Sequence, residues 1–161
     1  MRRIWTVVIL IAVAFYSAQT TYSQDKPQWI DEVEQMLEKE GWKPVRKRTY
    51  IEEKTKRFLS VTIQLKNNDT DATIDIKVNA STKEARGQFK GALTAYKVTK
   101  RPTMLNKFSG LGDENLIVPR GAGWIGITFR KGRVYTTVLA LSEETARSVA
   151  QLVADKIPNK N

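Results

Sequence analysis

The chain has 161 residues, with 27 Lys and Arg against 17 Asp and Glu, and therefore a formal net charge of +10. It contains no His and no Cys. These absences exclude a Ser-His-Asp triad, a Cys-His pair, a His-based zinc site, a haem His ligand and any disulfide. Carboxylate pairs, Ser-Lys dyads and all-oxygen cation sites remain possible. We expect neither a cofactor nor a bound metal.

Residues 1–23 have the order of a secretory signal peptide. Arg2 and Arg3 supply positive charge, residues 4–16 lack any charged or amide side chain, and small and polar residues follow to Ser23. The alternative is a retained membrane anchor, but a spanning helix needs about 20 apolar residues. We predict cleavage near Ser23, which leaves residues 24–161 as one domain of charge +8 that is secreted or periplasmic.

The first half of this domain predicts a helix followed by three strands. The helix spans residues 25–40, with Asp25 able to cap it and Gly41 ending it. A strand with a heavily charged face is expected over residues 45–52. Residues 58–66 and 72–78 alternate apolar and polar side chains around a polar turn, which predicts a hairpin with one face in water.

The second half repeats the order of one helix and three strands, and then adds a last helix. A capping box from Ser81 to Glu84 opens a helix that reaches about Tyr96. Within it, Gly87 and Gly91 are expected to pack closely on the sheet. A loop over residues 99–114 follows, and then come strands and a final helix. The strands are expected at residues 116–118, 124–130 and 134–141, and the helix after Ser142.

The strand at residues 134–141 is apolar on both faces, which is typical of a central strand covered on both sides. The order α-βββ-α-βββ-α, with strands joined in hairpins, predicts an α+β fold. We expect a mostly antiparallel sheet of about six strands, with helices packed on it in layers.

Residues 81–157 resemble bacterial exported domains of the Mog1p/PsbP-like fold, such as LpqN-type lipoproteins and the sensor domains of PknH-type kinases. Three features carry the resemblance: the helix with Ala85, Phe89 and Tyr96, the run from Gly110 to Glu114, and the hairpin around Lys131-Gly132. The resemblance implies this fold and a non-enzymatic role. The lipid attachment of those proteins does not carry over, because this chain has no Cys.

Asp113 and Glu114 form the most suggestive acidic pair. Loop carboxylates beside glycines are able to bind a divalent cation or to act as acid and base. The alternative is a turn leading into a strand, with Asp113 accepting backbone amides. The pair Glu143-Glu144 more simply favours a helix N-terminus. Residues 121–126 fit GxGxxG, but a strand pattern follows them, so they predict a hairpin turn rather than a nucleotide site.

A candidate site for an anionic partner comprises Lys97, Lys100, Arg101 and Lys107, at a helix end and in the following loop. The alternative is a solvated helix end. Other basic clusters alternate with aromatic residues that share the phase of apolar core positions. These aromatic residues, Tyr50, Phe58, Tyr96 and Tyr135, are therefore expected to be buried, and nucleic acid is not an expected partner.

The sequence thus predicts a small exported, non-enzymatic binding or sensor-like domain. Its partner would be an envelope protein, an anionic polymer or a lipid surface, with membrane attachment only if the signal segment is retained. The alternatives are a carboxylate-dependent hydrolase of envelope glycans and a basic module for anionic polymers. Asn68 and Asn79 lie in glycosylation sequons.

Overall fold

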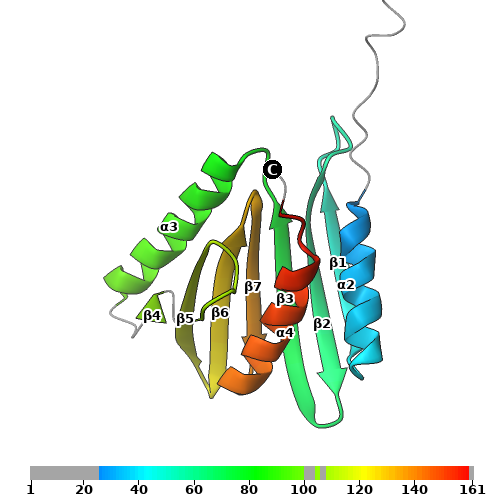
Figure 1. Ribbon diagram of the computed structural model, residues 1–161, viewed down its shortest axis with the longest axis vertical. Coiled ribbons are helices and arrows are strands. Elements are labelled where there is room, and N and C mark those ends of the chain that lie inside the picture. The colour runs from blue at the N-terminus through cyan, green and yellow to red at the C-terminus, as the bar shows by residue number, and fades with distance from the viewer. Residues whose placement is uncertain (1–25, 100–103, 106–107, 160–161) are drawn as a thin grey trace, which may run out of the picture.

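The last strand of the chain, β7 (Val134–Ala140), lies at the centre of the sheet, as its two apolar faces predict. It joins the two halves of the fold, because it pairs with β3 on one side and β6 on the other. In this computed structural model, which describes residues 26–99, 104–105 and 108–159, the sheet has seven strands in the order β1-β2-β3-β7-β6-β5-β4 (Figure 1). Every pairing between them is antiparallel, which confirms the α+β prediction.

The described elements follow one another along the chain as two units of three or four strands and a helix, preceded by one helix. They are α2 (Gln28–Lys39), β1 (Lys43–Ile51), β2 (Phe58–Asn67), β3 (Thr70–Val78), α3 (Thr82–Val98), β4 (Met104–Leu105), β5 (Glu114–Gly121), β6 (Trp124–Lys131), β7 and α4 (Glu143–Lys156). None of the helices within these described ranges is long and apolar enough to cross a membrane.

One face of the sheet is covered by α2 and α4. The apolar positions of β2, β3, β6 and β7 on this face form the main core with both helices. Ile30, Val33 and Leu37 of α2 are fully buried there, at the helical spacing that predicted this helix. In Figure 1, α4 crosses the central strands and α2 lies along the β1 side of the sheet.

The opposite face is covered only in part by described residues. Phe89 and Tyr96 of α3 pack against Leu116 and Val118 of β5, and Tyr135 of β7 borders the same cluster. The strongest contacts of α3 with the sheet strands are to β6 and β7. The half of this face that β1, β2 and β3 form has no comparable contact with α3.

Several boundaries differ from those predicted. The helix α2 begins at Gln28 with Pro27 at the N-cap position and no side-chain cap, while the predicted cap Asp25 lies outside the described residues. The loop predicted over residues 99–114 contains the two-residue strand β4. The strand β5 has eight residues instead of three, because its pairing with β6 begins at Glu114 and continues through a register shift to Gly121.

The two glycines in α3 are a correction. Gly87 and Gly91 do not pack on the sheet: both are exposed, and a Cβ atom at either position would meet nothing within 4 Å. The sheet-facing positions are instead Ala85, Phe89 and Tyr96. Small residues four apart share one stripe of a helix, but their spacing alone does not say whether that stripe faces the sheet or the solvent.

The glycines between β5 and β6 form the predicted hairpin turn. Gly121, Ala122 and Gly123 have φ values of 88°, 49° and 80°, in the left-handed region that a tight turn uses. Since β6 and not a helix follows this turn, the GxGxxG string lacks the helix N-terminus that would meet a pyrophosphate.

Candidate binding sites

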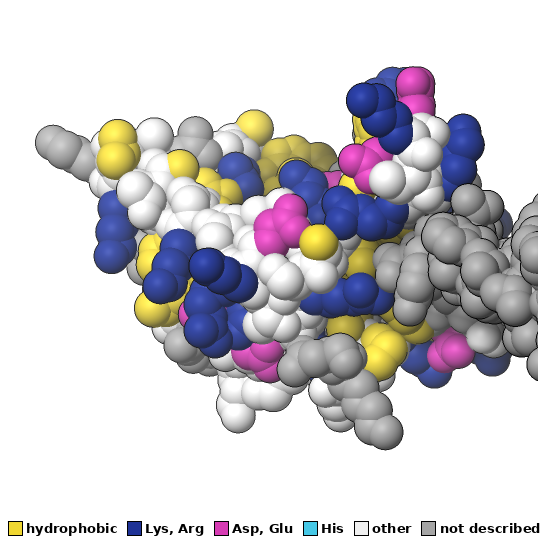
Figure 2. All heavy atoms as spheres, turned by 90° about the horizontal axis from the view of Figure 1, so that it is seen from above, with side chains coloured by type: hydrophobic (Ala, Val, Ile, Leu, Met, Phe, Trp, Pro, Cys, Tyr) yellow, Lys and Arg dark blue, Asp and Glu magenta, His cyan; other side chains and the backbone are white. Residues whose placement is uncertain are grey.

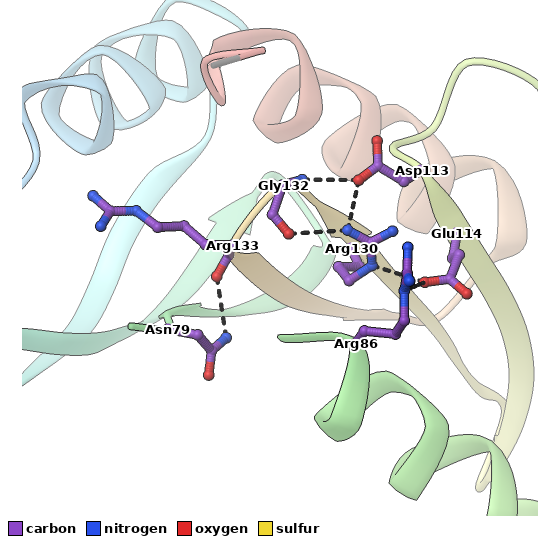
Figure 3. Close-up of polar contacts among 7 residues, drawn as sticks. All are labelled: Asn79, Arg86, Asp113, Glu114, Arg130, Gly132 and Arg133. Atoms are coloured by element: carbon purple, nitrogen blue, oxygen red, sulfur yellow. Dashed lines mark hydrogen bonds and ion pairs between the residues drawn. The ribbon is translucent and has the colours of Figure 1, made fainter. Parts of the chain in front are cut away.

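The acidic pair Asp113 and Glu114 lies beside the buried side chain of Arg130, which is 3% exposed. The Nη1 atom of Arg130 is 2.6 Å from Oδ2 of Asp113, and its Nε atom is 2.7 Å from Oε2 of Glu114 (Figure 3). Glu114 and Arg130 are direct partners in the pairing of β5 with β6. A single guanidinium therefore bridges the two adjacent carboxylates.

The same contacts fasten the turn before β5 to the turn between β6 and β7. Gly132 donates its backbone N–H to Oδ2 of Asp113 at 2.9 Å, and Arg130 donates to the carbonyl oxygen of Gly132 at 3.0 Å. The backbone N–H of Asp113 donates to the carbonyl oxygen of Arg130 at 2.7 Å. Asp113 accepts a backbone amide in a turn that leads into a strand, as the structural interpretation of this pair predicted.

A cavity of about 420 Å³ adjoins these residues and is lined by Arg86, Lys131 and the Arg130 cluster. Its charges are largely balanced within the protein. Arg86 lies 3.9 Å from Glu114, and Lys131 donates to the carbonyl oxygen of Ala154 at 2.8 Å. The cavity thus holds three cations and two acids, most of which already have partners, and it presents no strong field to a ligand.

This arrangement does not favour acid–base hydrolysis. A glycosidase needs two carboxylates that face each other across a cleft wide enough for substrate. Asp113 and Glu114 instead share one guanidinium. Among the described residues, no three acidic side chains gather closely enough to hold a metal ion.

A second site lies on the half of the sheet that no described helix covers, which we call the open basic face. It consists of Arg46, Arg48 and Tyr50 of β1 with Thr62 and Gln64 of β2, around a cavity of about 110 Å³. The three β1 residues share a face because side chains alternate along a strand. Each residue of β1 is exposed, since β1 is an edge strand with a partner on one side only.

The alternation separates paired from unpaired cations. Lys47, between the two arginines, points to the other face and contacts Glu34 of α2 at 2.6 Å. Neither Arg46 nor Arg48 forms an ion pair with an acid of the described ranges. The nearest acid in their rows, Asp75 of β3, accepts a hydrogen bond from Thr62 at 3.1 Å and lies 3.8 Å from Lys77.

The same face of β1, β2 and β3 is basic as a whole. The pairing register of these strands places five cations on this face, namely Lys43, Arg46, Arg48, Lys66 and Lys77. It places two acids there, namely Asp71 and Asp75. Figure 2, which looks onto the end of the molecule where β1 finishes, shows Lys and Arg side chains predominating over Asp and Glu. This face therefore has more cations than acids, and no described helix covers it.

Tyr50 corrects the prediction that the aromatic residues among the basic clusters are buried. It is 50% exposed, on the open basic face, whereas Phe58 and Tyr96 are buried as expected. Tyr135 is half-buried beside α3, and burial raises the pKa of its phenol above the ordinary value. The signal for Tyr50 was present in the sequence, because Arg46, Arg48 and Tyr50 recur every second residue.

The site predicted from the basic loop is only partly described. Lys97 is exposed in the last turn of α3, where a cation favours the helix C-terminus. Lys100, Arg101 and Lys107 lie outside the described residues. Lys97 and the Asp113-Glu114 pair are associated with opposite ends of α3, since Arg86 near its start reaches Glu114.

Two further expectations concern the helix α4 and the sequons. Glu143 and Glu144 occupy the first turn of α4, as expected for acids at a helix N-terminus. A cavity of about 680 Å³ is bordered, among the described residues, by α4 alone. Asn79 is buried and donates its side-chain amide to the carbonyl oxygen of Arg133 at 3.2 Å, so this sequon is engaged in the fold (Figure 3).

Comparison of this chain with protein-family models, with curated proteins and with solved structures finds no match. The resemblance to the Mog1p/PsbP-like fold stays a prediction. The α+β architecture and the two sites described above are the basis for a functional proposal.

Proposed function

We propose that the protein is an exported, non-enzymatic domain that binds an anionic partner through the open basic face. The observation that carries the proposal is that Arg46 and Arg48 point to the same uncovered face of the sheet and have no acidic partner among the described residues. The fold accounts for Lys47, which fastens β1 to α2 through Glu34. It does not account for the two arginines.

The chemistry of the arginines supports an anionic partner. A guanidinium offers several N–H donors in a planar fork and matches a carboxylate, sulfate or phosphate in two-point contacts. Two such groups on a rigid strand are held in fixed relative positions, which lowers the ordering cost of binding. Export, as the signal segment predicts, would bring this face to the anionic components outside the cytoplasm.

Arg130 differs from Arg46 and Arg48 in being paired within the protein, and this difference supports the proposal. Arg130 is 3% exposed and is matched by two carboxylates and a backbone carbonyl within the protein. Its donors serve the fold, so we assign it a structural role. Binding is better served by Arg46 and Arg48, which form no ion pair with an acid of the described ranges.

Retention on immobilised heparin, used as a polyanion probe, tests this proposal. The variant Arg46→Gln/Arg48→Gln removes two charges from the open basic face. The matched control Lys83→Gln/Lys90→Gln removes two charges from exposed positions of α3. We expect the arginine variant to lose about tenfold in affinity and to lower the slope of log Kd against log salt by about 1.5, because two counterion-releasing contacts are lost.

The control should stay within about twofold of the wild type. Equal losses in the two double variants would mean that heparin senses net charge alone, and this would overturn the proposal. An arginine variant that is retained like the wild type would also overturn it.

A further inference from the structure

Resting on the proposed function, we infer that the occupant of the open basic face is an acidic polysaccharide that lies along β1. The cations on this face recur along the strand direction. Arg46 and Arg48 are two residues apart, about 6.8 Å at the usual rise of a strand, and Lys43 continues the row toward the start of β1. A linear polymer with regularly placed carboxylate or sulfate groups meets such a row repeatedly.

The next rows of the same face carry uncharged hydrogen-bonding side chains. Gln64 is paired in register with Arg46 on one side and with Thr73 on the other, and Thr62 lies beside Arg48. Gln64 is exposed, and the two threonines are partly exposed. An amide and a hydroxyl both donate and accept hydrogen bonds, as sugar hydroxyls do. A row of anion-binding groups therefore borders a row that suits hydroxyls.

The composition of this face argues against a lipid surface and a nucleic acid. Between the two register shifts of β1, the positions of β1, β2 and β3 that share this face include no aliphatic side chain that would insert between lipid tails. The exposed aliphatic side chains of β1, Val45 and Ile51, lie at those shifts. Sequence-independent binding of single-stranded nucleic acid uses several aromatic side chains as stacking platforms. Here Tyr50 alone, at one end of the cationic row, offers an aromatic ring. One ring is enough to pack against a sugar.

A charge-neutral variant separates recognition of hydroxyls from attraction of charge. Gln64→Leu/Thr73→Val removes an amide and a hydroxyl from the rows beside the arginines and leaves all charges in place. We expect this variant to bind a soluble polyuronate about tenfold more weakly than the wild type, since two hydrogen bonds are lost. Its affinity for inorganic polyphosphate, which has no hydroxyl groups along the chain, should not change.

The control Gln35→Leu/Thr94→Val makes the same replacements at exposed positions of α2 and α3, and should bind both polymers like the wild type. Thermal unfolding of each variant verifies that the sheet is intact. Wild-type affinity of Gln64→Leu/Thr73→Val for polyuronate would overturn the inference. Tighter binding of single-stranded DNA or of anionic lipid vesicles than of polyuronate at equal salt would also overturn it.

These failures are distinct from failure of the proposed function. If the open basic face is not a binding site at all, Arg46→Gln/Arg48→Gln binds polyuronate and polyphosphate as the wild type does. If only the assignment to a polysaccharide is wrong, the arginine variant still loses affinity for both polymers, while the charge-neutral variant loses affinity for neither.

Discussion

The guanidinium of Arg130 contacts two carboxylates and one backbone carbonyl while it is almost wholly shielded from water. Shielding a charge is costly, and a partner recovers the cost only when the geometry is good and the remaining donors are satisfied. The close contacts with Asp113 and Glu114 meet this condition. Arg130 is therefore a residue on which the turn before β5 and the β6–β7 turn both depend.

We predict that Arg130→Ala lowers the free energy of unfolding by about 2–4 kcal/mol. Breaking a buried ion pair costs somewhat more, but Asp113 and Glu114 are 47% and 29% exposed, so water screens part of their loss. Urea unfolding monitored by circular dichroism measures this difference.

Arg86→Ala is the matched control, because Arg86 is 55% exposed and lies 3.9 Å from Glu114. A surface pair of this kind contributes less than about 1 kcal/mol. If the two variants unfold at the same urea concentration, Arg130 does not have the structural role assigned to it, and its cluster would have to be reconsidered as a ligand site.

The sequence predicts the acidic pair of this cluster but not its arginine partner. Asp113 and Glu114 are adjacent and follow glycines, which marks a turn. Arg130 lies 16 and 17 residues further along the chain, and only the register of β5 with β6 brings it to them. Pairing register depends on the complete sheet, so local pattern did not identify Arg130 as their partner.

At the scale of elements, the alternation of apolar and polar residues predicted β2 and β3 well, because one face of each strand is buried in the core. The edge strands were harder to predict. β1 is exposed along its whole length, and both residues of β4 are exposed. Without a buried face β4 has no apolar period to identify. Tyr50 was assigned to the core because of its aromatic ring, although it shares the two-residue phase of Arg46 and Arg48.

The helix α3 contains two glycines, Gly87 and Gly91, whose positions do not require glycine. Gly87→Ala and Gly91→Ala should each raise the free energy of unfolding by about 0.5–1 kcal/mol, because both positions are helical, exposed and open to an added methyl group. Thermal or urea unfolding of the single variants measures this gain.

Gly112→Ala is the opposite case and serves as the comparison. Its φ is 68°, and a Cβ atom there would lie 2.5 Å from the carbonyl oxygen of Arg130. We expect Gly112→Ala to lower the free energy of unfolding by about 2 kcal/mol or more. If Gly87→Ala and Gly91→Ala destabilise the protein instead, these two positions do not have the open space that the prediction requires.

At the scale of the whole molecule, the helices cover different strands on the two faces of the sheet. The face toward α2 and α4 is covered over β2, β3, β6 and β7, while α3 on the other face reaches β5, β6 and β7. β6 and β7 have helices on both faces, so we expect them to lie in the most stable part of the sheet. β1 carries Arg46 and Arg48, for which the described residues offer no acidic partner. The proposed binding part of the molecule therefore lies apart, along the sheet, from the strands that both layers cover.

This separation predicts a gradient of hydrogen exchange across the sheet. Backbone amides of β7, β3 and β6 should exchange most slowly, because these strands have partners on both sides and buried side chains. Amides of β1 should exchange fastest among the long strands, since one of its edges is unpaired.

Adding polyuronate should slow exchange in β1 and β2 and leave β5 and β6 unchanged, because the ligand stabilises the strands that it contacts. Mass spectrometry of peptic fragments, with and without the polymer, measures both effects. Uniform slowing over all seven strands would indicate a general stabilisation of the fold, and slowing confined to β5 and β6 would place the binding site under α3 rather than on the open basic face.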